Sequence, residues 1–479
     1  MKRPFKFSAA VLLGLLPGCT VGPSYHPPDL KPAPHWSSPL TGGETNMTAT
    51  NAAWWKTFQD EELNSLINRA ALSNLDLHMA QARVREARAA SAIVSANYWP
   101  NADASAAFSQ ERISKNGFPT FPPSIPLEAN VYQAGFDAAW ELDVFGGTRR
   151  AVEAANADIA AAEFGRRDVL VSLLGEVARY YIEGRGFQQR LVIARQNIQT
   201  EGEILSLTKD RFKSGLTSEL DVQQAAALLA TTQAQIPTFE TGFAQAAHRL
   251  SVLLGQSPGA LLTELSGESS IPGAPPAVPV GLPSELLRRR PDVQQAERQL
   301  AGATARIGVA VADLYPRFSL TGDVGLQSVS ASDWFSAGSR FWSVGPTVQW
   351  KIFDAGRIRA NIRVQNARQE QVLAHYEQTV LASFEDVENA LTAYAKEQTR
   401  HKSLTDAVEA NRQAVEIATQ LYQSGLADFL RVLDSQRSLY ESQDALVQSE
   451  RAVVLNLIAL YKALGGGWQT MPAQAAARS

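Results

Sequence analysis

Apolar and polar residues alternate in two stretches of the chain. In YPRFSLTGDVGLQS (315–328), apolar side chains stand at even positions from Phe318 to Leu326 and polar ones at odd positions from Ser319 to Gln327. WPNADASAAFSQ (99–110) opens on a similar aromatic-proline pair and resembles it. A period of two predicts β-strands with one apolar and one wet face.

An aromatic-rich stretch follows each of these, so four strands are predicted, at about 101–113, 130–142, 317–328 and 340–352. Their outward faces carry the aromatic side chains Tyr132, Phe136, Trp140, Trp342 and Trp350. Their wet faces carry the carboxylates Asp103, Asp137, Glu141 and Asp323, which we expect to line a lumen. The strand length suits an outer-membrane barrel. The alternative, a soluble sandwich with one buried face, needs a core that four strands hardly supply.

The remaining pattern is helical and occurs twice. Residues recur at offsets of 216 and then 210, as in the SGL triplets at 214–216 and 424–426. We therefore predict two repeats, 60–270 and 284–468, joined by a proline-rich connector at 271–283. Each repeat is predicted to run helix, strand, loop, strand, long helix, turn, long helix. The change of offset places a six-residue length difference in one strand-connecting loop.

The long helices are predicted at about 148–213, 219–254, 356–422 and 428–464. Apolar residues follow a seven-residue grid, which predicts helices that supercoil with partners: Leu373, Val380, Val387, Tyr394, Val408, Val415 and Tyr422. A helix from 148 to 213 would be about 100 Å long. Pro237 should kink or break the helix that contains it. A cytosolic coiled-coil rod would explain the grid but not the strands.

The N-terminus MKRPFKFSAAVLLGLLPGC is typical of a secretory signal, predicted at 1–18. Cys19 is the only cysteine, and we expect it to be acylated and to anchor an extended segment, 19–59, to a membrane surface. Pro17 departs from the usual small residue at its position, and the alternative is an ordinary signal with an incidental cysteine. One cysteine excludes a disulfide within the chain or a thiolate metal site.

Composition narrows the function further. A net charge of −4 argues against a nucleic-acid partner. The six histidines are scattered without HExxH, and neither GxSxG nor a glycine-rich phosphate loop occurs, so no enzyme, catalytic residue, metal or cofactor beyond the lipid is predicted. After the signal no run of 18 apolar residues remains, so any bilayer crossing would use strands of a closed barrel. Since four strands cannot close a barrel, the chain must oligomerise.

Several stretches carry a resemblance to a known family. They are CTVGPSY (19–25), LLRRRPDVQQAERQLAGATARIGVAVADLYPRFSLTG (286–322), RFKSGL (211–216), LYQSGL (421–426) and HRLSVLLG (248–255). The chain resembles an outer-membrane factor: a TolC-like, NodT-type lipoprotein channel of tripartite RND-type efflux systems. The resemblance covers nearly the whole chain after the signal, but not a flexible tail at 469–479.

The resemblance implies a mixed α/β membrane protein and a homotrimer. Its 12-stranded outer-membrane β-barrel would continue into a long periplasmic α-helical barrel, with the loops 114–129 and 329–338 outside the cell. The implied partners are a periplasmic adaptor, an inner-membrane RND-type pump and outer-membrane lipid. The implied function is a passive exit duct for drugs or other small molecules. The alternatives are a type I protein-secretion channel and a lipid-anchored coiled-coil structural lipoprotein.

The resemblance also implies sites. Leu430 and Asp434 would form apolar and acidic rings at a periplasmic gate, which pH or cations could open; alternatively, Asp434 is an ordinary surface charge. The turns with Gly215, Leu216, Gly425 and Leu426 would contact the adaptor, and the glycines are foremost helix caps. The acidic lumen would favour cations, or its carboxylates merely keep the pore hydrated. Arg288, Arg289 and Arg290 are expected to be a solvated helix end.

Overall fold

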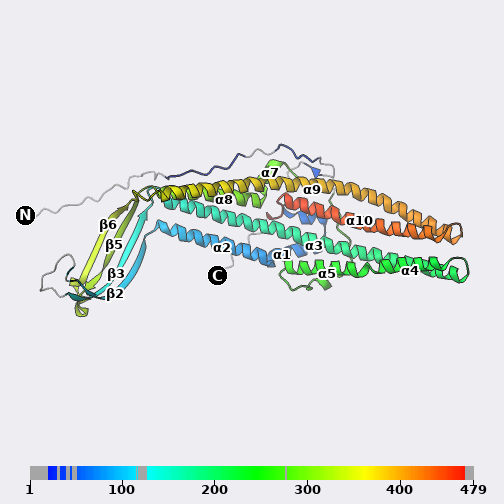
Figure 1. Cartoon of the computed structure of the whole chain (residues 1–479), viewed down its shortest axis with the longest axis horizontal. Helices are drawn as coiled ribbons and strands as arrows, with labels where there is room; N and C mark the ends of the chain where they lie inside the picture. Colours follow the sequence, from blue (N-terminus) through cyan, green and yellow to red (C-terminus); the bar gives the residue numbers. More distant parts are fainter. Residues whose placement is uncertain are drawn as a thin grey trace, which may run out of the picture. The chain divides into compact units, whose positions relative to one another are not determined.

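The computed structural model describes residues 20–29, 33–38, 44–45, 51–114, 116, 127–275 and 278–469 (Figure 1). Cys19, most of the 114–129 loop and the tail beyond 469 lie outside the described residues. The chain divides into two compact units: Met1–Pro28, Arg85–Ala161 and Glu297–His375 form the first, and Asp29–Val84, Ala162–Ala296 and Tyr376–Ser479 the second.

The first unit contains a four-stranded antiparallel sheet. Its strands follow the order β2-β3-β5-β6, with β2 at Asn101–Arg112, β3 at Glu128–Leu142, β5 at Arg317–Ser328 and β6 at Arg340–Gln349. Even-numbered residues pair with even-numbered ones, and odd-numbered with odd-numbered. One face of the sheet therefore carries mainly apolar side chains and the other mainly polar ones. Both outer strands, β2 and β6, have an edge that no other described strand covers.

The last strand is shorter than the sequence predicts. β6 ends at Gln349 rather than at 352, so Trp350 and Ile352 lie beyond it. Gln349 pairs with Arg317, the first residue of β5, and the residue before it is Pro316, which has no N–H to donate. The chain then turns into the next helix.

Helix ends approach the foot of the sheet in the same way in both repeats. The helices are α2 (Leu75–Ser95), α3 (Gly147–Lys213), α8 (Pro291–Ala312) and α9 (Arg357–Gln423), with a 3-10 turn, η2, at Ala96–Tyr98. The indole N–H of Trp140 donates to the carbonyl of Tyr98 at 2.9 Å, and that of Trp350 donates to Leu314 at 3.0 Å. These two bonds occupy equivalent positions of the two repeats.

The second unit is helical. Besides the remaining parts of the helices named above, it contains α1 (Glu61–Ser73), α4 (Glu219–Gln233), α5 (Ile236–Leu253), α6 (Leu262–Leu265), α7 (Pro283–Arg289) and α10 (Phe429–Ala463). Two short strands, β1 (Glu44–Thr45) and β4 (Val278–Pro279), pair in parallel. The main core surrounds Trp54, whose ring stacks on Tyr461 at 5.3 Å.

Two expectations about the helices are wrong. Each repeat opens with a short and a long helix, α1 then α2 and α7 then α8, rather than with one helix, because Asn74 in one repeat and Pro291 in the other start a new helix. Part of the expected extended segment 19–59 is a 3-10 helix, η1 (Asn51–Phe58), whose Trp54 and Trp55 are buried in the core.

The predicted break at Pro237 is confirmed. The helix stops at Gln233 and resumes at Ile236, which places Pro237 in the first turn of α5, where its missing N–H has no intrahelical role. The corresponding helix of the second repeat, α10, is continuous over 35 residues. Within the described part of the chain, no helix combines the length and apolarity needed to cross a membrane.

Candidate functional site

Three of the four predicted lining carboxylates lie in one row across the sheet. Asp103 pairs with Asp137, Asp137 with Asp323, and Asp323 with Ser343, whose hydroxyl donates to the Asp323 carboxylate. The side chains of the three aspartates and of Ser343 all lie on the polar face of the sheet. The alternation predicted the face of each aspartate, but their common row depends on the strand register.

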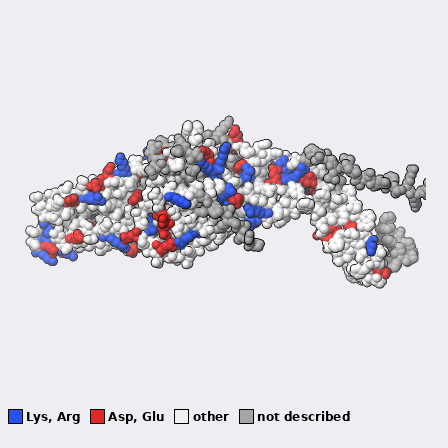
Figure 2. Space-filling view, turned by 180° about the vertical axis from the view of Figure 1, so that it is seen from behind, with Lys and Arg blue, Asp and Glu red and all other residues white. Residues whose placement is uncertain are grey.

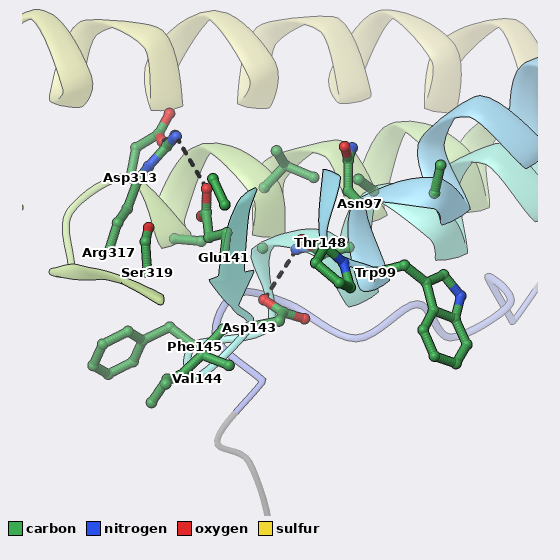
Figure 3. A pocket seen from close by; sticks show the side chains of 18 of the residues that line it. Asn97, Trp99, Glu141, Asp143, Val144, Phe145, Thr148, Asp313, Arg317 and Ser319 are labelled. Carbon is green, nitrogen blue, oxygen red and sulfur yellow. Dashed lines mark hydrogen bonds and ion pairs between the residues drawn. The ribbon is translucent and has the colours of Figure 1, made fainter. Parts of the chain in front are cut away.

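Glu141 lies on the same face, nearer the foot of the sheet. Its carboxylate is 3.8 Å from Arg317, whose guanidinium also contacts Asp313 at 2.6 Å. These groups border a cavity of about 770 Å³ between the strand feet and the helix ends of the first unit (Figure 3). Asp143 lies in the same cavity and accepts from the backbone N–H of Thr148 at 3.0 Å, which caps α3.

The segment that follows Cys19 is held against the first unit. The buried guanidinium of Arg150, on α3, donates to the carbonyls of Val21 and Gly22 at 3.2 and 3.3 Å and to the Ser24 hydroxyl at 3.4 Å. The N–H of Val21 donates to the carbonyl of Phe145 at 3.1 Å. The described part of the CTVGPSY stretch, residues 20–25, therefore forms a strap that is docked against the start of α3.

Glycines allow this close docking. Gly22 has φ +84°, and a Cβ there would collide with the backbone of Gly308 on α8. Gly146 has φ +80°, and a Cβ there would lie 2.9 Å from Thr20. Both positions thus need glycine for conformation and for space.

Both helix-turn tips end in the same motif. At the first, Leu216 N–H donates to Arg211 carbonyl at 2.8 Å, and Gly215 has φ +72°. At the second, Leu426 N–H donates to Leu421 at 2.8 Å, and Gly425 has φ +77°. This six-to-one bond with a left-handed glycine is a Schellman cap.

The tips present apolar side chains to the outside. Leu216 is 65% exposed and Leu426 is 77% exposed. The two tips also touch each other, because the Arg211 guanidinium lies 4.7 Å above the Tyr422 ring and donates to the Gln423 carbonyl at 3.3 Å. Exposed leucines on two turns that contact each other suit a protein contact.

Leu430 and Asp434 share the exposed face of α10, one helical turn apart. On the opposite face Phe429, Val432 and Leu433 pack into a small core. The structure therefore leaves both predicted gate residues free of the chain's own core.

The prediction that Arg290 belongs to a solvated helix end is wrong. Its side chain is only 12% exposed and donates to Asp292 at 2.7 Å, to Asp386 at 2.9 Å and to the Ala463 carbonyl at 3.3 Å. Burial alone would lower the pKa of Arg290, but these carboxylates raise it. In the first repeat, the neutral amide of Asn74 takes the equivalent place and donates to the Leu253 carbonyl at 2.9 Å.

Sequence reasoning missed a buried acid. Glu201, on α3, is 3% exposed; one carboxylate oxygen accepts from the Thr232 hydroxyl at 2.9 Å and the other has no partner among the described residues. Burial raises the pKa of Glu201. A comparison of the two repeats could have indicated it, because a polar residue, Asn411, stands at the equivalent position of the second repeat. Its amide donates to the Ser442 hydroxyl at 3.1 Å. No group of metal-ligating side chains occurs among the residues described.

A sheet with one apolar and one polar face, joined to two long helical hairpins, fits the chain of an outer-membrane channel. The chain belongs to the outer membrane efflux protein family, whose model matches residues 66–256 and 282–466, one match in each repeat.

Individual relatives are similar along almost their whole length. The pyoverdine export outer membrane protein OpmQ of Pseudomonas aeruginosa is 33% identical over 98% of both chains. Nodulation protein T of Rhizobium leguminosarum bv. viciae is 32% identical, over 97% of this chain and 94% of its own. The solved outer-membrane channel OprN superposes with a TM-score of 0.88 at 38% identity, covering 94% of this chain and all of its own.

These comparisons confirm the predicted family, the TolC-like fold with two repeats and the non-enzymatic channel function. The protein is the outer-membrane channel component of an efflux pump, and it therefore works with pump partners. The lipid anchor, the trimer, the adaptor and the site residues remain predictions.

Proposed function

We propose that three copies of the chain close one 12-stranded barrel, which forms the exit duct of a tripartite efflux pump. The observation that carries this proposal is the pair of open edges on a two-faced sheet. β2 and β6 expose backbone donors and acceptors that no other described strand of the chain covers. In a bilayer each uncovered group is costly, so β6 of one copy would pair with β2 of the next.

The apolar face has the right height for a bilayer. Between Tyr132 and Leu142 on β3 lie ten residue steps, about 34 Å of strand at 3.4 Å each. Tilted by about 40°, this becomes roughly 26 Å, close to the apolar band of outer-membrane barrels. Tyr132 near one end and Trp140 near the other suit the two interfaces.

The polar face would line the duct. Asp103, Asp137 and Asp323 lie in one row across three neighbouring strands, so three copies would place nine carboxylates on the wall of the duct and favour cations. The helices would continue as a periplasmic tube, with transport passive and driven by the pump.

The N-terminus would carry a lipid on Cys19. The docked strap at 20–25 supports this proposal, because it would hold the acylated cysteine near the foot of β3, where a membrane surface is expected. The anchor adds to the barrel rather than replacing it.

At the far end, the tips with Leu216 and Leu426 would dock a periplasmic adaptor that links the channel to an inner-membrane RND-type pump. Leu430 and Asp434 would surround the threefold axis as an apolar and an acidic ring that narrows the closed duct. The related proteins are named for pyoverdine export and for solvent efflux, which supports small-molecule cargo delivered by the pump.

The test is the mass and conductance of the purified full chain in detergent. We expect trimers that conduct ions as single channels in a planar bilayer. A monomer that stays soluble without detergent would contradict the barrel, and with it the duct.

A further inference from the structure

Arg340 is a cation on the apolar face of the sheet without an acidic partner in the described part of the chain. It is the first residue of β6, stands in register with Leu326 and shares its apolar face, and makes no ion pair with another described residue. Arg112 lies on the same face nearer the loops, but its guanidinium contacts Glu128 at 2.9 Å. An arginine facing lipid without a carboxylate needs another anion.

A hollow lies beside Arg340 on the same face. Its volume is about 740 Å³, and the small residues Ala104, Ala106 and Ala134 line it. Phe136 and Trp342, which are 66% and 74% exposed, border it. The small side chains between two large rings leave room for a hydrocarbon chain.

Aromatic rings lie on the loop side of Arg340. Phe108 and Tyr132 are 4.9 Å apart between centroids, and Tyr132 is 5.8 Å from Trp334. Trp334 is tied to the sheet through its indole N–H, 3.4 Å from the Leu326 carbonyl. Such a belt lies at the headgroup level of a membrane, so Arg340 stands where apolar chain meets headgroup.

We propose that this surface binds a phosphorylated glycolipid of the outer leaflet, with a phosphate on Arg340 and an acyl chain in the hollow. The planar guanidinium can bind phosphate through two parallel N–H groups. Charged side chains are sparser over the sheet than over the helices on the face that Figure 2 shows. Pairing of β6 with a neighbouring copy would engage the strand edge and leave this face open.

The proposal rests on the proposed function in one respect: the loop end of the sheet must lie in the outer leaflet. It adds a ligand to the outside of the barrel, whereas the duct concerns its inside. The two therefore make separate predictions.

Native mass spectrometry of the full-length protein in detergent would test the site with diphosphorylated lipid A as the probe. We expect Arg340→Gln to weaken lipid A binding about tenfold, the loss of one charge-assisted contact. Arg340→Lys should retain part of the binding, because an ammonium group also attracts phosphate. The matched control is Arg112→Gln, which removes a paired arginine from the same face and should leave lipid A binding unchanged.

Equal binding by the wild type and Arg340→Gln would overturn the site, and so would equal losses in both glutamine variants. Phosphatidylglycerol provides the second arm: binding as tight as that of lipid A and equally dependent on Arg340 would overturn the choice of glycolipid. Trimer mass and conductance are measured on the same samples. Their absence in the wild type would defeat the proposed duct, whereas their presence with no Arg340-dependent binding would defeat only the lipid site.

Discussion

The two repeats place a charged residue in one copy where the other has a neutral amide. Arg290 in the second repeat occupies the place of Asn74 in the first, and each donates to the end of the helix that closes its repeat. Glu201 in the first repeat occupies the place of Asn411 in the second, and each bonds to a hydroxyl of the neighbouring helix.

The predicted gate position likewise has a charged residue in one repeat and a neutral amide in the other. Asp434 has Gln224 as its equivalent, while the leucine one turn before it is present in both, as Leu430 and Leu220. The fold therefore needs a polar bond or a leucine at these places and is satisfied without charge. The effect of each charge can be tested by removing it and comparing the result with a change at the equivalent uncharged position of the other repeat.

The largest effect is expected at Arg290. Arg290→Ala should destabilise the protein by about 3 kcal/mol, because it leaves the half-buried Asp292 without its cation. Asn74→Ala should cost only about 1 kcal/mol, the loss of a cap and a neutral bond. Thermal unfolding in detergent measures both.

The exposed Arg288 provides the control for this pair, and Arg288→Ala should leave the unfolding midpoint unchanged. Equal losses for Arg290→Ala and Asn74→Ala would mean that the charge contributes nothing beyond the bond.

The start of the long helices offers a second contrast. Arg150 holds the strap at 20–25, whereas its equivalent in the second repeat is Ala360. In a protein with Ser24→Cys, Arg150→Ala should raise the rate of thiol labelling about tenfold, because the strap loses its charged donors.

Arg306→Ala is the control for the strap. Arg306, on α8 of the same unit, pairs with Asp158, so its loss should leave labelling at position 24 slow. Fast labelling in the parent protein would show that the strap is not docked in solution.

Glu201 should make stability depend on pH. Its folded pKa is raised by burial, so the protonated form stabilises the fold at low pH and that contribution is lost as pH rises through the folded pKa. Glu201→Gln should therefore be more stable than the wild type at pH 8 and equally stable at pH 4.

Unfolding of both proteins across this pH range measures the difference. Asn411→Gln alters the equivalent neutral bond of the second repeat and should change stability equally at every pH. Parallel pH profiles for wild type and Glu201→Gln would exclude the buried acid as the cause.

The smallest effect is expected at the gate. Asp434→Ala should change the closed-state current in a planar bilayer by about twofold, since in the proposed trimer three carboxylates near one axis would repel each other and attract cations. Gln224→Ala, at the equivalent uncharged position, should leave that current unaltered. An unchanged current in Asp434→Ala would remove Asp434 from the gate.

Local rules predicted much of this architecture. The alternation of apolar and polar residues predicted the strands and assigned Asp103, Asp137 and Asp323 to one face. The sequence offsets predicted the two repeats, and Pro237 predicted the helix break. The prediction for Arg290 failed because a run of three arginines before a proline shows only local charge. Its partners Asp386 and Ala463 are distant in sequence.

The sequence by itself determined which stretches form the four long strands and the long helices, that Pro237 breaks a helix and which strand face is polar, since these depend on neighbours a few residues away. Only the tertiary structure decided that three aspartates lie in one row, that Glu201 is buried beside Thr232 and that Arg340 lacks an acidic partner among the described residues. Register and burial depend on contacts between segments far apart in the chain, and no local pattern specifies them.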